Sequence, residues 1–560
     1  MPETILVAAA WPYANGPLHL GHVAGCYLPA DIFARFHRAL GNQVLFVSGS
    51  DQHGTPVTVR AETEGKPPSE IAQRYHDSFL ESWQQLGITW DLYTRTGTEN
   101  HAQVVHRMFT TLLEKGYLHK STTETFYCAQ CARFLPDRYV EGGCPYCGSG
   151  RSRGDQCDEC GKPLNADQLV NPACRLCGGE PRLTPSEHFF LDLGAFNDRL
   201  LAWVEAQTHW KPNVRAFTLN VLREGLQPRP ITRDLEWGIP VPVEGFETKR
   251  VYVWFEAVIG YLSASIEWAA RSGEPEAWKA WWSPPARSYY FIGKDNIWFH
   301  TIIWPAMLMG YGDLLLPYDV PANEYLTLEH RQFSTSRNWA IWVPDFLSRY
   351  DPDPLRYVLS INMPESSDTD FSWREFVRRN NDELVAAYGN LVHRTLTITY
   401  RSCQGRVPPA GELGPAEQAI LGQARDTFAA VTEHLAACRF RAAVSQVLAL
   451  AREGNRYFDS KAPWKQVKED PAGAGTTLNT CVQLINVLKL LFYPFLPFSS
   501  ERLQQMLGFE HSLGQARGIW RLELDAVPAE TVIAEPQPLF RRLEDSVAEE
   551  ELARLERESS

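Results

Sequence analysis

Four Cys-x-x-Cys pairs, closely spaced in one stretch of the chain, are the feature that most constrains its fold. They hold eight of the twelve cysteines: Cys128/Cys131, Cys144/Cys147, Cys157/Cys160 and Cys174/Cys177. An isolated pair is often a redox motif, but four neighbouring pairs favour metal binding. Eight thiolates suffice for two tetrahedral zinc sites, and a site with four thiolates leaves no open position for a catalytic water. The surrounding residues, about 117–183, have few aliphatic runs. The pattern therefore predicts an inserted domain stabilised by structural zinc.

Spacing does not decide how the four pairs combine. In a nested arrangement the two inner pairs hold one ion and the two outer pairs hold the other. In a sequential arrangement each ion is held by two consecutive pairs. Both arrangements provide four thiolates for each ion.

Length and composition indicate a folded protein of several structural units. The chain has 560 residues, of which 44% are hydrophobic and 22% charged, so a wholly disordered or fibrous chain is excluded. No apolar run reaches the ~20 residues that a membrane-spanning helix needs. The N-terminus lacks the basic region of a signal peptide, and we expect a cytoplasmic protein. The net charge of −13 neither indicates nor excludes a nucleic-acid partner.

Hydrophobic patterns predict an α/β domain interrupted by the insertion. Apolar runs at residues 5–10 and 43–47 flank an amphipathic stretch that ends at Gly41, a predicted helix C-cap. Apolar runs return after the insertion at residues 251–255 and 289–292, which we interpret as strands. The simplest arrangement is a Rossmann-like domain split into two halves.

The C-terminal part of the chain has helical periodicity. Apolar residues recur at steps of three and four, as in Leu478, Val482 and Ile485, which predicts an all-α bundle. The expected domains are residues 1–116 and 236–320 for the two halves of the Rossmann-like domain, 117–235 for the insertion, 321–375 for a connector, 376–535 for the bundle and 536–560 for a charged tail.

A short histidine motif follows the first predicted strand. His19, Gly21 and His22 stand where the first helix begins. Glycine allows a phosphate to approach the backbone, and a helix N-terminus offers it free N–H groups. Two histidines one turn apart can donate hydrogen bonds to the same phosphates. The alternative is a pair of surface histidines beside a capping glycine.

Residues 11–22, Trp-Pro-Tyr-Ala-Asn-Gly-Pro-Leu-His-Leu-Gly-His, resemble the HIGH signature of class I aminoacyl-tRNA synthetases. The Pro-Tyr-x-Asn-Gly part resembles the methionyl-tRNA synthetase family in particular. Further similar segments follow in the family's order at residues 50–56, 252–261, 291–300 and 461–464. The resemblance covers nearly the whole chain.

The resemblance implies a methionine pocket made of Tyr13, Asp51, Trp254, Ala257, Tyr261 and His300. A carboxylate at Asp51 suits the ammonium group of an amino acid, and aromatic walls suit a thioether. Without the resemblance, ordinary core packing would be the better interpretation of Trp254 and Tyr261.

The resemblance also implies ATP binding by His19, Gly21, His22, Gly293, Asp295, Ser334, Thr335 and Ser336. Asp295 would accept a hydrogen bond from the ribose, and Mg²⁺ is expected on the phosphates. The implied reaction is attack of the methionine carboxylate on the α-phosphate. A tRNA hydroxyl then attacks the adenylate that results.

The family's Lys-Met-Ser-Lys-Ser loop is altered here. Gln332 and Thr335 replace its two lysines, while Arg331 and Arg337 flank the loop. We assign the missing positive charge to Arg337, together with His19 and His22 as the catalytic groups. Arginine differs from lysine as a rigid bidentate donor. The alternative is a non-catalytic or weakly active tRNA-binding protein.

Three further predictions follow from the resemblance. The family's insertion favours the nested zinc arrangement. Asn390, Arg394 and Trp464 match its readers of a CAU anticodon, and unpaired bases are read by hydrogen bonding and stacking. Because the family's additional C-terminal dimerisation module is not expected, we predict a monomer. A synthetase for valine, leucine or isoleucine is the other alternative, but those chains carry a large editing insertion for which this chain has no room.

Overall fold

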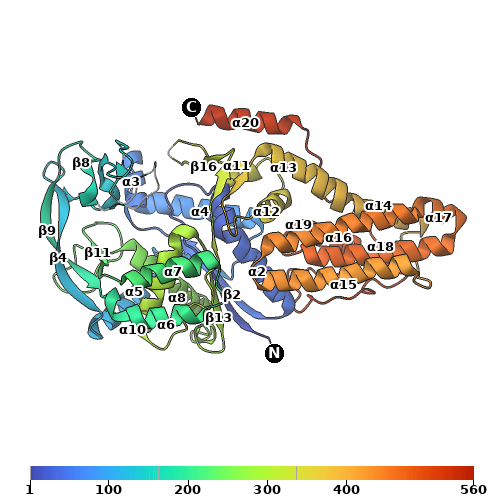
Figure 1. Cartoon of the computed structure of the whole chain (residues 1–560), viewed down its shortest axis with the longest axis horizontal. Helices are drawn as coiled ribbons and strands as arrows, with labels where there is room; N and C mark the ends of the chain where they lie inside the picture. The colour runs from blue at the N-terminus through green and yellow to red at the C-terminus, as the bar shows by residue number, and fades with distance from the viewer. Residues whose placement is uncertain are drawn as a thin grey trace.

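The structure is a computed structural model that describes residues 2–559, except 151, 155, 156, 158, 160–163, 165 and 336. Cys160 and Ser336, both assigned above, lie outside the described residues. Figure 1 shows an elongated molecule with the sheet-containing part at one end and a long helical bundle at the other. No helix within the described part of the chain is long and apolar enough to cross a membrane.

A five-stranded parallel sheet forms the centre of the first part. Its order is β14 (Ala322–Asn323), β13 (Arg287–Gly293), β1 (Thr4–Ala9), β2 (Gln43–Ser50) and β3 (Leu92–Arg95). All four strand pairs are parallel. β1 lies between β2 and β13, so the strand order reverses beside it. In such sheets ligands bind at the carboxyl ends of the strands next to this point.

β1 is buried on both sides of the sheet. Ile5, Val7 and Ala9 belong to one hydrophobic core, whereas Leu6 and Ala8 belong to another. This division follows from the two-residue period of a strand. The first core continues into the helical bundle, so the two ends of the molecule share apolar packing.

A nearly continuous helix follows β1. It comprises α1 (Leu20–His22), a π-helical turn (Val23–Tyr27) and α2 (Leu28–Leu40). Gly41 ends it with a φ of 92°, which confirms the predicted C-cap. The opposite face of the sheet is covered by α5 (Glu99–Glu114), α8 (Val253–Arg271) and α10 (Trp304–Tyr311). The predicted Rossmann-like α/β fold is therefore confirmed.

The strand predicted at residues 251–255 is wrong in most of its length. Only Arg250–Val251 is a strand (β12), and Val253 already begins α8. The apolar residues continue well into α8, where both sides of the helix are buried. A short apolar run does not distinguish a buried strand from the first turns of such a helix.

The insertion leaves the sheet as a long antiparallel ribbon. β4 (Leu118–Cys128) pairs with β9 (Arg182–Leu191), and the small strands β6 (Val140–Gly143), β7 (Ser152–Arg153) and β8 (Val170–Cys174) lie beyond its tip. Cysteines make up much of the small core there. After the ribbon, α6 (Asn197–Ala206) and α7 (Pro212–Glu224) pack into the core that covers the central sheet.

A connector joins the sheet to the bundle. It contains β15 (Leu326–Leu328), β16 (Arg331–Gln332), β17 (Thr369–Phe371), α11 (Val343–Leu347), α12 (Pro352–Ile361) and α13 (Trp373–Arg379). The bundle contains α14 (Asn390–Ser402), α15 (Pro415–Ala436), α16 (Phe440–Lys461), α17 (Pro463–Glu469), α18 (Pro471–Phe492) and α19 (Pro497–Met506). The predicted all-α bundle is confirmed. The last helix, α20 (Ser546–Glu558), folds back and packs against α13 (Figure 1).

Candidate active site

One pocket opens near the carboxyl ends of the central strands. It is lined by all six residues expected to bind methionine, together with neighbours from the same elements: Tyr13, Asp51, Trp254, Ala257, Tyr261 and His300, with Ala10, Trp11, Val258 and Asn296. Four chain segments contribute to this lining, and the parallel sheet brings them together. The structure thus gathers in one place residues that are almost 290 positions apart in the sequence.

Aromatic rings form most of the wall. The ring of Trp254 stacks on Phe299 with centroids 4.3 Å apart and meets Tyr13 edge-on at 5.9 Å. The Tyr261 hydroxyl lies 2.7 Å from Nε2 of His300, whose Nδ1 lies 2.8 Å from the carbonyl of Asn296. The His300 Nδ1–H donates to that carbonyl, so Nε2 accepts from the tyrosine. Burial lowers the pKa of His300 to about 4, so this imidazole is neutral at pH 7.

Asp51 brings a carboxylate to the end of β2. Main-chain bonds fix it beside the first loop, since its N–H donates to the carbonyl of Pro12 and its carbonyl accepts from Ala14, both at 2.8 Å. Its side chain is buried, and Oδ1 accepts from the N–H of His53 at 3.2 Å. Burial, and then the charge of Glu256, raise the pKa of Asp51 well above its usual value.

A second acid lies behind Asp51 that the sequence did not single out. Glu256 is fully buried, and its Oε1 lies 3.0 Å from Nδ1 of His53. Its Oε2 has no hydrogen-bond partner within the described residues. Two neighbouring buried acids favour an incoming cation, such as an ammonium group, because it relieves the cost of burying negative charge. Asp51 and Glu256 both belong to segments that carry the resemblance, but no pattern in those segments predicts that the two acids are neighbours.

The histidine motif packs against the connector. The main chain of residues 18–20 pairs with residues 341–343, and the rings of His19 and His22 stack 3.7 Å apart. The His19 N–H donates to Nδ1 of His22, which leaves the hydrogen of that ring on Nε2. Burial lowers the pKa of His22 to about 4, and burial followed by the charge of His22 lowers that of His19 well below its usual value. Both rings are therefore neutral at pH 7, and each keeps one ring N–H that can donate a hydrogen bond.

Gly21 leaves little room for a side chain beside these rings. A Cβ at this position would lie 3.0 Å from the His19 ring, which is closer than ordinary contact. The ring of Phe333, in the altered loop, stacks on His19 with centroids 4.7 Å apart. Phe333 stands where the family's loop has methionine, and no sequence pattern indicated a role for it.

The remaining residues assigned to ATP lie on two segments. Gly293 ends β13, and Asp295 lies in the following 3₁₀ turn, where the Tyr325 hydroxyl donates to its Oδ1. Ser334 and Trp339 exchange main-chain hydrogen bonds at 2.9–3.0 Å, and the carbonyl of Thr335 accepts from Asn338. The altered loop is therefore a short main-chain turn facing the histidine motif.

Arg337 points toward the insertion. Its guanidinium is 3.1 Å from Glu159, and both side chains are exposed. The adjacent Asn338 donates to the carbonyl of Glu558 in α20 at 2.9 Å. Arg331 instead covers the ring of Trp339 at 4.7 Å.

The cysteines form two groups. The sulfurs of Cys128, Cys131, Cys174 and Cys177 lie within 4.8 Å of one another, and a second group contains Cys144, Cys147 and Cys157. The separations are 3.5 Å for Cys128–Cys177, 3.8 Å for Cys131–Cys174 and 3.6 Å for Cys147–Cys157. Sulfurs ~2.3 Å from a tetrahedral zinc are about 3.8 Å apart, so the thiols fit this ion. The outer pairs group together, as in the nested arrangement.

The residues assigned to the anticodon meet near one end of the bundle. Arg394 pairs with Asp459 at 2.7 Å and lies over the rings of Phe458 and Trp464, at 4.5 and 5.3 Å from their centroids. Trp464 is 41% exposed. Asn390, one turn before Arg394 on α14, is also exposed.

Comparison with known proteins agrees with this geometry. The family model described as tRNA synthetases class I (M) matches residues 5–396, and that of the anticodon binding domain of methionyl tRNA ligase matches residues 407–559. The methionine–tRNA ligases of Thermomicrobium roseum and of Dehalococcoides mccartyi strain CBDB1 are 55% and 58% identical to this chain. They align with 99% of it and with 99% and 100% of their own lengths.

A solved structure has the same fold. Mycobacterium tuberculosis methionyl-tRNA synthetase bound by methionyl-adenylate superimposes with a TM-score of 0.78 at 25% identity, over 97% of this chain and 100% of the other. With the sheet, the pocket and the helical bundle in place, these matches show that the chain belongs to the methionyl-tRNA synthetase family of class I.

Proposed function

We propose that this protein joins methionine to tRNA through a methionyl-adenylate. The observation that carries the proposal is the small pocket at the carboxyl ends of the strands, which buried Asp51 and several aromatic rings line together. The similarity to methionine–tRNA ligases along nearly the whole chain favours a catalytic protein over a non-catalytic tRNA-binding one.

In the first half-reaction, a carboxylate oxygen of methionine attacks the α-phosphorus of ATP as the bond to pyrophosphate breaks. Asp51 accepts the ammonium group, and Tyr13, Trp254, Ala257, Tyr261 and His300 surround the thioether. His19 and His22 donate to the phosphates beside Gly21, and Gly293, Asp295 and residues 334–336 hold the nucleotide. Bound Mg²⁺ neutralises part of the phosphate charge. Positioning and charge stabilisation supply the catalysis.

In the second half-reaction, a terminal hydroxyl of tRNA attacks the carbonyl carbon of the adenylate and AMP leaves. Asn390, Arg394 and Trp464 read a CAU anticodon on the bundle. The pocket and the bundle belong to one chain, so the site is complete in a monomer. We propose that the protein acts in the cytoplasm, where translation uses its product. We also propose that its domains have the boundaries predicted from the sequence.

The two cysteine groups hold two structural zinc ions in this proposal. The support is the set of sulfur separations close to those of a tetrahedral site. Cys160 is assigned as the fourth ligand of the inner group.

The test of the proposed function is amino-acid-dependent exchange of pyrophosphate into ATP. We expect exchange with methionine to exceed that with valine, leucine or isoleucine. A preference for another amino acid would reject the substrate, and tRNA binding without exchange would establish the non-catalytic alternative.

Replacing Arg337 by glutamine tests its catalytic role. We propose that Arg337 leaves Glu159 and contacts the phosphates in the transition state. Loss of one such contact lowers kcat by about 10²-fold in comparable sites, while the KM for methionine is expected to stay the same. Arg331→Gln is the matched control, because this arginine packs on Trp339. Equal effects of the two changes on kcat would contradict the assignment.

A further inference from the structure

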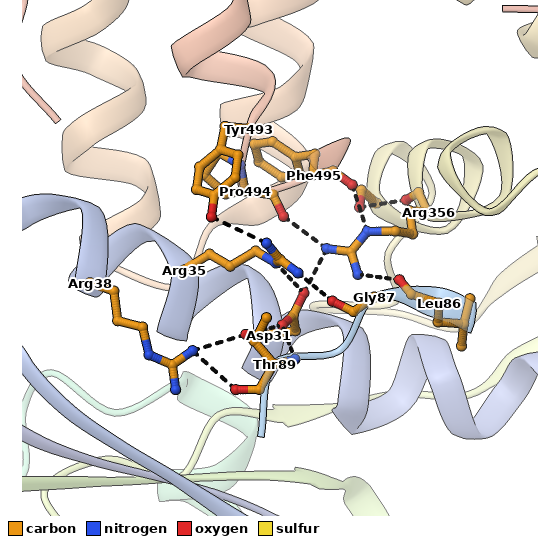
Figure 2. Close-up of polar contacts among 11 residues, drawn as sticks. Asp31, Arg35, Arg38, Leu86, Gly87, Thr89, Arg356, Tyr493, Pro494 and Phe495 are labelled. Carbon is orange, nitrogen blue, oxygen red and sulfur yellow. Dashed lines mark hydrogen bonds and ion pairs between the residues drawn. The ribbon is translucent and has the colours of Figure 1, made fainter. Parts of the chain in front are cut away.

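A buried ionic cluster lies where the central sheet, the connector and the bundle meet (Figure 2). We name Asp31, Arg35 and Arg356 the interdomain cluster. Oδ2 of Asp31 accepts from Arg35 Nε at 2.8 Å and from Arg356 Nη2 at 2.7 Å. Asp31 and Arg356 are fully buried, and Arg35 is 6% exposed. Asp31 and Arg35 lie on α2, whereas Arg356 lies on α12, 325 positions from Asp31.

The interdomain cluster holds the corner between α18 and α19 of the bundle. Arg356 donates to the carbonyls of Phe495 at 2.8 Å and Pro494 at 2.9 Å, and Arg35 donates to the Tyr493 hydroxyl at 3.3 Å. One turn before Arg356, Asp353 accepts from the N–H of Ser499 in the first turn of α19 at 2.6 Å. Helix α12 therefore binds both sides of the corner, including an N–H that α19 leaves unpaired.

The same cluster holds the central sheet. Arg356 donates to the carbonyl of Leu86, the last residue of α4 (Pro68–Leu86), at 3.0 Å, and Arg35 donates to the carbonyl of Gly87. Oδ1 of Asp31 accepts from the N–H and the hydroxyl of Thr89 at 2.9 and 2.7 Å. These residues lead into β3. Figure 2 shows the two guanidinium groups between the loop on one side and the corner on the other.

Two helices run from the interdomain cluster toward the two candidate binding sites. Asp31 is nine residues beyond His22 in a nearly continuous helix, which is about 14 Å at 1.5 Å per residue. From the other side, α18 extends for 22 residues, or roughly 33 Å, and packs against α17, which carries Trp464. A change of angle at the cluster is therefore enlarged at the far end of the bundle.

The directional hydrogen bonds of the interdomain cluster resist rotation of the bundle, which apolar packing alone does not. An apolar surface tolerates small rotations, because burial depends on area rather than direction. Two buried guanidinium groups do not tolerate such rotations, because a rotation would leave a buried charge without its hydrogen-bond acceptors. The cluster therefore specifies one orientation of the bundle.

We propose that Asp31, Arg35 and Arg356 are positioning residues for the transfer step: they hold the bundle at the angle at which a tRNA bound through its anticodon presents its 3′ end to the adenylate. The inference rests on the proposed function. It requires that activation of methionine, which needs no tRNA, proceeds without the cluster.

Arg356→Met tests this inference. Asp31 keeps Arg35 as its partner in the variant, and methionine is an unbranched side chain. We expect kcat/KM for aminoacylation to fall about 10²-fold, the cost of a misplacement of about 1 Å. Pyrophosphate exchange and binding of an RNA hairpin with the anticodon loop are expected to stay within about twofold of the unchanged protein, which is 0.4 kcal/mol or less.

Two further variants complete the experiment. Arg394→Gln is expected to weaken hairpin binding, which Arg356→Met is expected to leave intact, and this difference separates anticodon contact from positioning. Tyr493→Phe removes one acceptor of Arg35 and is expected to lower aminoacylation in the same direction but less. It decides the question if Arg356→Met does not fold.

Equal losses of exchange and aminoacylation would show a merely structural role and overturn the inference. The inference would also be overturned if Arg356→Met aminoacylated tRNA as fast as the protein without substitutions. If Arg356→Met does not fold, the same result in Tyr493→Phe would overturn it. If the protein without substitutions showed no methionine-dependent pyrophosphate exchange, the proposed function itself would be refuted.

Discussion

Asp51→Asn is expected to raise the KM for methionine in pyrophosphate exchange by about 10²- to 10³-fold. Asparagine has the shape of aspartate but no charge. Removing one partner of a buried, hydrogen-bonded charge pair costs about 2–5 kcal/mol, and the pocket buries Asp51 almost completely. The KM for ATP is expected to change little, because the nucleotide is assigned to other residues. Initial rates at varied methionine and ATP concentrations measure both values.

Two controls sharpen this result. Asp77→Asn changes an exposed aspartate of α4 and is expected to leave both KM values unchanged. A methionine analogue without its amino group has no ammonium for Asp51. Its inhibition constant is therefore expected to be no higher in Asp51→Asn than in the protein without substitutions. If KM for ATP rose as much as KM for methionine, Asp51 would not be the partner of the ammonium group.

Cys174→Ser is expected to reduce bound zinc from about two ions per chain to about one. Cys174 is buried in the outer cysteine group, and a serine hydroxyl is a poor replacement for a thiolate ligand of zinc. Since metal binding stabilises a domain with a small core of its own, the insertion is expected to become sensitive to protease while the bundle remains resistant. Metal analysis and limited proteolysis measure the two effects.

Cys403→Ser is the matched control, since Cys403 follows α14, far along the chain from both cysteine groups. It is expected to retain two zinc ions. The assignment of zinc to the cysteine groups would be contradicted if the protein without substitutions contained no zinc. It would also be contradicted if Cys174→Ser kept two ions.

Local patterns were sufficient for much of the fold. The apolar run of β1, the glycine after α2 and the three- and four-residue steps in α18 are each patterns of a single element. The segments that carry the resemblance contained the six residues predicted to bind methionine, and all six line the pocket. Residues 251–255 were misassigned because a short apolar run fits either a strand or a buried helix.

The order of residues along the chain was therefore enough to predict most of the elements and the residue types of each site. Which of these residues meet depended on how the elements pack. Spacing left the grouping of the cysteines open. The contact of His53 with Glu256 spans 203 positions, and that of Asp31 with Arg356 spans 325. The physical reason is that propensity and periodicity act within a few turns of the chain, whereas a buried ion pair depends on the packing that brings distant segments together.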